Sequence, residues 1–518
     1  MHEIITLQLG QTSNYLATHF WNTQESYFTY DGEEGPLNHD IHFRPGIGAG
    51  GTETFMPRTL IYDLKGGFGS LKKINALYEI EEGKALPKGL WDGQPIIQQI
   101  TPIEQHPYQR SLDEGLEPPE LTTGTIRYWS DFNRVFYHPR SVIQLDEFEL
   151  NSVLMPFEKW GIGEELFYSL DKEHDLLDRD LRPFAEESDQ LQALQVITGV
   201  DDAWGGFAAR YLERLRDEFG KTSIWVWGLG NDRQISREKH QSKILNLARS
   251  LQGISPQASL YIPLAVPPRP LPPYVSLDRN SEWHRSALFS TALETMTLPS
   301  RLKASREKQV TLSQIEGFLN VNGNQKIACL QLSVLKPGFH SQSPTNPAVA
   351  ATDSRELRNP NKEDAIPTGP AVLDMDLSPR EMERSSRGTS SKVHTFGQVE
   401  VVRSTEASMS SPDSTHQLPQ RLAGLPVVQS TTLVQPFLDS SPRLFWGQEP
   451  QHTRSTGPFA VHTSLSTTSS VSAQIKSAQS IVGRLAGLDE REALLNELGE
   501  IREAYQEGWD SGSDEDDD

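Results

Sequence analysis

The first group of residues that could do chemistry lies at the start of the chain. Ile4–Leu9 is a run typical of a buried β-strand, and Gly10 after it permits a tight turn. Gln11, Thr12 and Asn14 then open a stretch with helical spacing. Because the backbone N–H groups at a helix N-terminus attract anions, this order predicts a turn that could bind phosphate. The alternative is that the three polar residues only make the turn and cap the helix.

A second group lies in the loop before a helical stripe that runs from Phe207 to Phe219. This loop holds two acidic residues and a bulky aromatic one, Asp201, Asp202 and Trp204. Two carboxylates are poor neighbours for a polyphosphate, since like charges about 4 Å apart repel by roughly 4 kcal/mol at an effective dielectric constant of about 20. The interpretation we favour is that Asp201 or Asp202 caps the helix instead.

Several segments of the chain resemble tubulins, in which a strand ending in Gly-Gln opens a nucleotide-binding sheet. These segments are Met1–Trp21, Pro57–Gly66, Glu187–Gln195, Tyr211–Phe219 and, more weakly, Tyr261–Leu264. The combination of tubulin-like segments, a degraded phosphate loop and long insertions resembles the Misato family. The resemblance implies a tubulin-related protein linked to mitochondrial distribution and inheritance, and the long Ser- and Pro-rich insertion suggests a fungal member.

The resemblance also implies a nucleotide site that has decayed. Tubulins bind GTP with a Gly-Gly-Gly-Thr-Gly-Ser-Gly loop, and an alignment without gaps places Val200–Gly206 on it, where only Gly206 keeps a glycine of the pattern. Lys65 stands where many tubulins have an acidic residue, and no second glycine loop can be matched between residues 66 and 190. We therefore expect no cofactor, with residual GTP binding as the less favoured alternative. The expected remnant of the site is Gly10, Gln11, Thr12, Asn14 and Gly206.

Composition limits the partners of the chain. Its 518 residues carry a formal net charge of −22, which argues against binding nucleic acid or anionic lipid, because both need basic patches. No apolar run approaches the ~20 residues that cross a bilayer. Because the first basic residue is Arg44, we also expect no Arg-rich mitochondrial presequence. The family resemblance then implies a cytoplasmic, mitochondrion-associated protein whose partners are cytoskeletal or mitochondrial-surface proteins.

Strand-like and helical stretches alternate through residues 1–235, which predicts an α/β fold with a tubulin-like parallel sheet flanked by helices. The expected strands are Ile4–Leu9, Leu60–Tyr62, Ser141–Ile143, Leu194–Ile197 and Ile224–Leu229.

The second half of the chain is expected to form a smaller α+β domain. A strand pair is predicted over Gly317–Val334, and a helical stripe broken near Gly487 is predicted over Ala473–Tyr505. Enrichment in Ser, Thr and Pro predicts that 336–425 is a disordered insertion, and Ser464–Ser472 is a second polar patch. The expected divisions are 1–115 and 116–235 (tubulin-like nucleotide fold), 236–335 (intermediate segment), 336–425 (insertion), 426–509 (partly helical C-terminal region) and 510–518 (acidic tail).

Other candidate residues have simpler explanations. Cys329, the single cysteine, lies in a strand-like run and is expected to be a small buried core residue rather than a nucleophile. His39 and His42 could suggest a metal site, but an isolated pair in a Gly-rich loop is expected to be solvated. The sequence contains no Walker-type loop, no zinc-spaced histidine set and no nucleophile elbow.

The favoured hypothesis is a non-enzymatic, tubulin-like scaffold or adaptor involved in mitochondrial partitioning and mitochondrial DNA inheritance. This role follows from the family resemblance, because a fold alone does not establish a function. One alternative is an assembly or chaperone-type factor for cytoskeletal proteins. The other is a polymerising GTPase, which the degraded loop disfavours.

Overall fold

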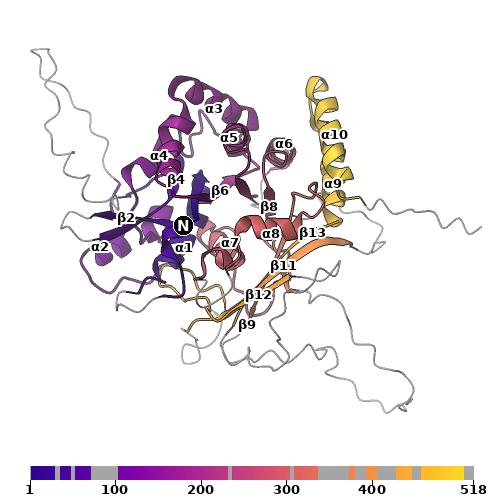
Figure 1. The fold of residues 1–518 in the computed structure, drawn as a ribbon. Helices are drawn as coiled ribbons and strands as arrows, with labels where there is room; N and C mark the ends of the chain where they lie inside the picture. Colours follow the sequence, from indigo (N-terminus) through magenta and orange to yellow (C-terminus); the bar gives the residue numbers. More distant parts are fainter. Residues whose placement is uncertain are drawn as a thin grey trace, which may run out of the picture.

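The structure is a computed structural model that describes residues 2–29, 35–47, 53–71, 103–231, 236–303, 309–335, 373–379, 393–404, 427–445 and 457–506. Its elements fall into two sheets with helices packed on and between them (Figure 1). Within the described ranges, no helix is both long and apolar enough to cross a membrane.

The first sheet has six strands in the order β5-β4-β1-β6-β7-β8, and every neighbouring pair is parallel. The strands are β1 (Glu3–Leu9), β4 (Thr59–Lys65), β5 (Val142–Glu149), β6 (Leu191–Gly199), β7 (Ser223–Leu229) and β8 (Leu260–Leu264). All seven residues of β1 and of β7 are buried. The predicted parallel sheet of the N-terminal half is therefore confirmed.

Side chains of each strand alternate between two apolar cores, one on each face of this sheet. From β1, Ile4 enters one core, and Ile5 and Leu7 enter the other. Helices α3, α5 and α6 cover the second face, and α1 and α7 lie on the first (Figure 1). The bounds are α1 (Gln11–Glu25), α3 (Trp160–His174), α5 (Ala203–Glu218), α6 (Arg237–Ile254) and α7 (Glu282–Thr297).

The second sheet is mixed, in the order β10-β9-β13-β11-β12. Only the β11–β12 pair is parallel, and the other pairs are antiparallel. Its strands are β9 (Cys329–Leu335), β10 (Met375–Asp376), β11 (Thr395–Arg403), β12 (Val427–Thr431) and β13 (Ala460–Thr468). A separate hairpin pairs β2 (Phe43–Ile47) with β3 (Glu53–Pro57).

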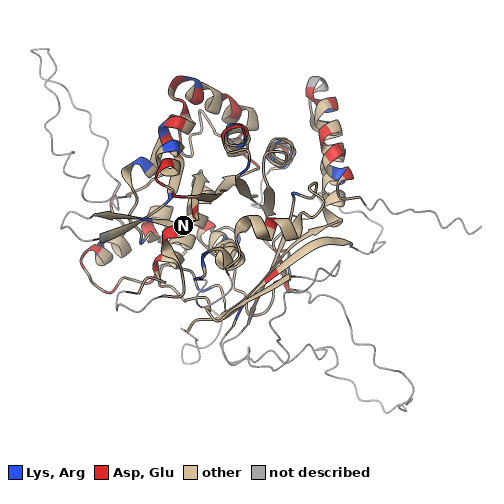
Figure 2. Ribbon diagram, viewed as in Figure 1, with Lys and Arg blue, Asp and Glu red and all other residues tan. Residues whose placement is uncertain are grey.

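The remaining described helices are shorter or lie near the C-terminus. They are α2 (Pro107–Asp113), α4 (Arg182–Glu186), α8 (Leu312–Leu319), α9 (Ser470–Leu485) and α10 (Leu488–Glu503). The helical stripe predicted over the C-terminal region, with its break near Gly487, is confirmed by α9 and α10. Charged residues are frequent along α3 and α10, whereas the strands carry few (Figure 2).

The prediction that 336–425 is wholly disordered is wrong where the second sheet uses this segment. Strand β11 pairs with β13 on one side and β12 on the other, and Val399 and Val401 are buried in the core. Polar composition hid the strand because only alternate residues of β11 need to be apolar. Apart from residues 373–379 and 393–404, the segment 336–425 lies outside the described residues, as does the tail at 510–518. The polar patch at Ser464–Ser472 likewise overlaps β13, which is an inner strand.

The strand pair predicted over Gly317–Val334 is also wrong in its first half. Residues 312–319 form α8, which begins with a capping box between Thr311 and Gln314. Leu312, Ile315 and Leu319 are buried at helical spacing, and this burial favours a helix. Only β9 of the expected pair is present.

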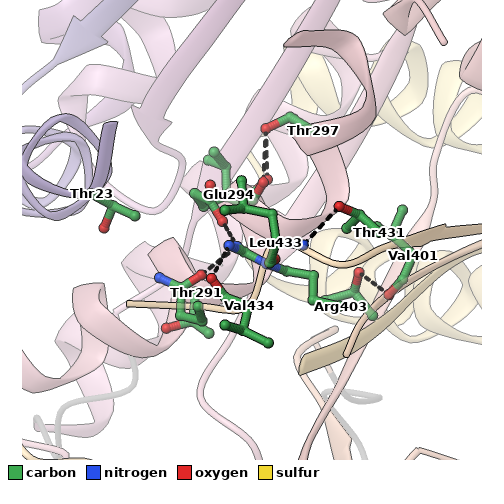
Figure 3. Close-up of polar contacts among 12 residues, drawn as sticks. Thr23, Thr291, Glu294, Thr297, Val401, Arg403, Thr431, Leu433 and Val434 are labelled. Carbon is green, nitrogen blue, oxygen red and sulfur yellow. Dashed lines mark hydrogen bonds and ion pairs between the residues drawn. The ribbon is translucent and has the colours of Figure 1, made fainter. Parts of the chain in front are cut away.

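Helix α7 lies between the two sheets and carries a carboxylate into the interior. Glu294 is fully buried and forms an ion pair with Arg403 of β11 (Figure 3). It forms a second ion pair with Arg301, 3.0 Å away, just after α7. Tyr27, which follows α1, donates a hydrogen bond to the same carboxylate at 3.1 Å. We call these four residues the α7 junction.

The α7 junction joins segments that are distant in the sequence. The guanidinium of Arg403 also donates to the backbone carbonyls of Leu433 and Val434, at 2.7 and 2.9 Å (Figure 3). Burial alone would raise the pKa of Glu294, but the charges of Arg403 and Arg301 outweigh it and hold that pKa below its ordinary value. The junction therefore ties the end of α1 and helix α7 to strand β11 of the second sheet.

Candidate functional site

The strand order of the first sheet predicts where a ligand would bind. The chain runs from β1 outward through β4 to β5, and then from β6 outward in the opposite direction through β7 to β8. Open parallel sheets bind ligands at the carboxyl ends of the two strands where this direction changes. Here those strands are β1 and β6, which are adjacent.

A cavity of about 190 Å³ lies at that position, and we call it the switch-point cavity. It is smaller than the roughly 300–1,000 Å³ of typical small-molecule sites. Its walls come from the turn after β1 (Leu9–Thr12), from the loop after β5 (Glu149–Ser152 and Pro156–Glu158) and from the start of α5. The strand ends thus bring Gly10, Gln11 and Thr12 of the predicted site together at one cavity.

The indole of Trp204 fills the space beside Gly10. A Cβ atom at Gly10 would lie only 2.4 Å from Nε1 of Trp204, and Gly10 has a φ of +87°. Both the close contact and the backbone angle require glycine here. Trp204 also packs edge-on against Phe157, with ring centroids 5.2 Å apart. The indole of Trp204 therefore covers the backbone of Gly10, which a phosphate would otherwise be able to approach.

The carboxylate of Asp202 already caps the helix whose N-terminus would face a phosphate. Its Oδ1 accepts a hydrogen bond from the backbone N–H of Trp204 at 2.9 Å, and α5 begins at the next residue, Ala203. This confirms the interpretation that Asp201 or Asp202 is the cap. Burial, and then the charge of Asp201, raise the pKa of Asp202 to about 7.

The neighbouring Asp201 turns toward α6 instead of the cavity. Its carboxylate is 2.7 Å from Nζ of Lys243 and accepts a hydrogen bond from the backbone N–H of Asn231 at 3.0 Å. Asp201 is thus paired with a cation, whereas Asp202 is held by a neutral backbone donor.

Gln11 and Asn14 direct their amides to a buried acid on the next strand. Both Nε2 of Gln11 and Nδ2 of Asn14 donate to Oδ2 of Asp63, at 2.6 and 2.7 Å. Gln11 also donates to the carbonyl of Gly67. Burial raises the pKa of Asp63 to about 7, although these hydrogen bonds act in the opposite direction. The two amides therefore stabilise the turn after β4, and Asn14 does not line the cavity.

Gly206 has a packing role on the face of α5 that meets α3. A Cβ atom there would lie 2.0 Å from the backbone carbonyl oxygen of Trp160. Gly163 on α3 is equally restricted, because its Cβ would lie 1.7 Å from the carbonyl oxygen of Ala203. The two glycines let the helices approach closely, and Gly206 does not line the switch-point cavity.

The charged side chains that line the cavity are all acidic among the described residues: Glu149, Glu158 and Asp202. Nζ of Lys239 lies 2.9 Å from Glu158 and neutralises one of them. Sequence reasoning did not find Glu149, Glu158 or the acceptor Asp63 as site residues. Asp63 stood in a recognisable segment, but its contact with Gln11 and Asn14 depends on the pairing of β1 with β4.

Comparison with known proteins agrees with this architecture. The Misato Segment II tubulin-like domain matches residues 2–114, and a Tubulin domain matches residues 118–302. The chain is 48% identical to Protein dml1 of Aspergillus oryzae over 517 residues, which cover 99% of each chain. It belongs to the Misato/Dml1 family of tubulin-like proteins.

Other members of the Misato/Dml1 family match to different extents. Protein dml-1 of Neurospora crassa is 48% identical over 545 residues and is covered in full, as is this chain. Protein dml1 of Schizosaccharomyces pombe is 34% identical over 327 residues, which cover 59% of this chain and 67% of that protein. The resemblance inferred from the sequence is therefore confirmed, and the relatives named here are fungal.

The two remaining sequence candidates have different outcomes. Cys329 is buried in the core, as expected. The expectation that His39 and His42 are solvated is wrong for His42, which is buried edge-on against Phe20 and Trp21. His39 is partly buried and stacks on Phe28, with ring centroids 3.8 Å apart. In the described part of the chain, no group of three or more His, Cys, Asp or Glu side chains could hold a metal ion.

Proposed function

We propose that this chain is a non-enzymatic, tubulin-like scaffold or adaptor that acts in mitochondrial partitioning and mitochondrial DNA inheritance. We further propose that it works in the cytoplasm and at the mitochondrial surface, through protein partners. Membership of the Misato/Dml1 family supports the biological role. The observation that supports the absence of GTP chemistry is the position of Asp202 and Trp204, which occupy the helix cap and the glycine turn where phosphates would lie.

Three physical effects act together against a nucleotide. The carboxylate of Asp202 occupies the N–H group that an anion would need, and the indole of Trp204 takes up the space at Gly10. The described residues that line the cavity supply no Lys or Arg to neutralise phosphate charge. The fold can then serve as a rigid framework for partner binding, which needs no hydrolysis.

Titration calorimetry of the full chain with GTP and Mg²⁺ tests the biochemical half of the proposal. We expect no heat of binding at micromolar ligand and no phosphate release. Micromolar binding with turnover, lost in a folded Thr12→Val variant, would contradict the proposal and favour a GTPase, because Thr12 lines the cavity.

Replacement of the chromosomal gene in the source cells tests the cellular half. Depletion should disturb mitochondrial partitioning, and Gln11→Ala should restore it if the variant folds. Normal mitochondrial partitioning after depletion, together with stable co-purification of tubulin or its folding machinery, would favour the assembly-factor hypothesis instead.

A further inference from the structure

The loop after β5 presents three consecutive apolar side chains to solvent. Val153 and Leu154 are 93% and 94% exposed, and Met155 is 54% exposed. Among the described residues, the other exposed large apolar side chains are separated from one another in the sequence. Single exposed apolar residues are ordinary, but a contiguous group on an ordered loop commonly marks an interaction site. We call these three residues the apolar tip.

Hydrogen bonds hold the two ends of this loop in place. The backbone N–H of Leu150 donates to the carbonyl of Lys65 at 3.0 Å, and that of Ser152 donates to Glu149 at 3.2 Å. The N–H of Met155 donates to Oγ of Ser152, also at 3.2 Å. The apolar tip is therefore fixed outward and does not reach the core.

The apolar tip stands at the rim of the switch-point cavity. The residues on both sides of it, Asn151–Ser152 and Pro156–Glu158, line that cavity. Glu149 lines it as well and has no ion pair among the described residues, whereas Glu158 is paired with Lys239. Apolar side chains and a carboxylate without an ion pair in the described part of the chain thus lie next to each other at the rim of the cavity.

We propose that this surface docks a segment of a protein partner that places apolar side chains on Val153 and Leu154 and a Lys or Arg side chain at Glu149. The cavity favours a basic occupant, because Glu149, which lines it and has no ion pair among the described residues, carries a negative charge. The chain's net charge of −22 makes an anionic membrane a poor occupant. Two copies of the chain that met through this same surface would place two Glu149 carboxylates in one interface, and neither copy would supply a Lys or Arg from the described cavity lining.

This docking surface rests on the proposed adaptor role and specifies the chemistry of one partner. Selection of a phage-displayed library of random peptides on the full-length chain is the direct test. We expect the selected peptides to combine Arg or Lys with neighbouring Leu, Ile, Val or Phe. The Val153→Ser, Leu154→Ser double variant and the Glu149→Gln variant should each weaken a selected synthetic peptide by about tenfold or more, as for central interface residues.

Matched controls separate this surface from general stickiness and charge. Val321→Ser removes an apolar side chain that is 58% exposed elsewhere, and Glu165→Gln removes an exposed acid on α3. Neither should change peptide affinity. A charge exchange adds a positive test, since Glu149→Arg should bind the same peptide once its basic residue is replaced by Glu.

Several results would overturn the proposal. These are failure to select any peptide, selected peptides without basic residues, or binding that the variants at Leu154 and Glu149 leave unchanged. A dimer in sedimentation that Leu154→Ser dissociates would show that the occupant is a second copy. Binding to phosphatidylserine vesicles that Leu154→Ser abolishes would show a lipid occupant.

The two proposals can fail separately. If peptide docking is absent while the chain still supports mitochondrial partitioning without GTP, only the docking surface is wrong. If the chain binds and hydrolyses GTP, the scaffold proposal falls whatever the peptides show.

Discussion

Two regions of this molecule hold buried acidic residues, and the pKa values of these residues are shifted in opposite directions. At the α7 junction, Glu294 is fully buried between Arg301 and Arg403, and its pKa lies below the ordinary value. Beside the switch-point cavity, Asp63 and Asp202 have neutral hydrogen-bond donors, and their pKa rises to about 7. Nearby cations decide the difference, because burial raises the pKa of all three carboxyl groups.

The comparison shows that polar side chains at strand ends and helix ends can serve the fold itself. At the α7 junction, Glu294, Arg301 and Arg403 neutralise one another and link α7 to the second sheet, so their charges are already paired. At the cavity, the side chains of Asp202 and Trp204 occupy the helix cap and the space beside Gly10, and Gln11 and Asn14 donate hydrogen bonds to Asp63. Residues that look like remnants of a site thus have structural roles.

The largest effect is expected from breaking the α7 junction. Glu294→Gln leaves two buried arginines without a counter-charge, and we expect the free energy of unfolding to fall by about 3–5 kcal/mol. Urea denaturation followed by circular dichroism measures this change. Arg182→Gln, which breaks exposed ion pairs with Asp178 and Glu218, is the control and should change the stability far less. Equal losses in the two variants would contradict the distinction between the regions.

A smaller loss of stability is expected from Trp204→Ala, which empties the space beside Gly10. We expect the free energy of unfolding to fall by about 3 kcal/mol, which is the lower end of the range for Trp→Ala substitutions in a core, because Trp204 borders an existing cavity. Calorimetry should still detect no GTP binding, since Asp202 keeps the helix cap. Tyr168→Ala, at a half-exposed position on α3, is the control for loss of an aromatic ring. Micromolar GTP affinity in Trp204→Ala would show that bulk alone excludes the nucleotide.

The smallest effect is expected at the helix cap. Asp202→Ala should lose about 1 kcal/mol of stability, because a capping oxygen is removed. Asp202→Asn keeps an oxygen without the charge and should be close to the original protein at pH 5.

Raising the pH sharpens this test. The folded-state pKa of Asp202 is raised to about 7, so the folded form binds more protons than the unfolded form between pH 3.8 and 7. The stabilising effect of that extra proton is therefore lost as pH rises through this window. Between pH 5 and pH 8, the unfolding temperature of Asp202→Asn should rise relative to that of the original chain. A constant difference would mean that Asp202 is already ionised at pH 5.

Local sequence patterns predicted much of the first sheet and part of the site. The run Ile224–Leu229 is apolar on both faces, which is typical of a strand buried in a parallel sheet, and Ile4–Leu9 has a wholly apolar face formed by Ile5, Leu7 and Leu9. The capping role assigned to Asp201 or Asp202 also needed only local information. The pattern failed for β11, where alternating polar residues resembled a disordered segment, and for α8, where a turn signal outweighed a capping box.

The sequence by itself therefore determined the family, the parallel sheet, the terminal helices and the loss of the glycine loop, because these depend on composition and neighbouring residues. Only the tertiary structure decided which partners the polar residues have. Asp63 meets Gln11 because β4 pairs with β1, and Glu294 meets Arg403 because α7 packs on a strand more than a hundred residues away. Contacts between residues that are distant in the sequence leave no local pattern, because the partner of each side chain does not lie in the surrounding sequence.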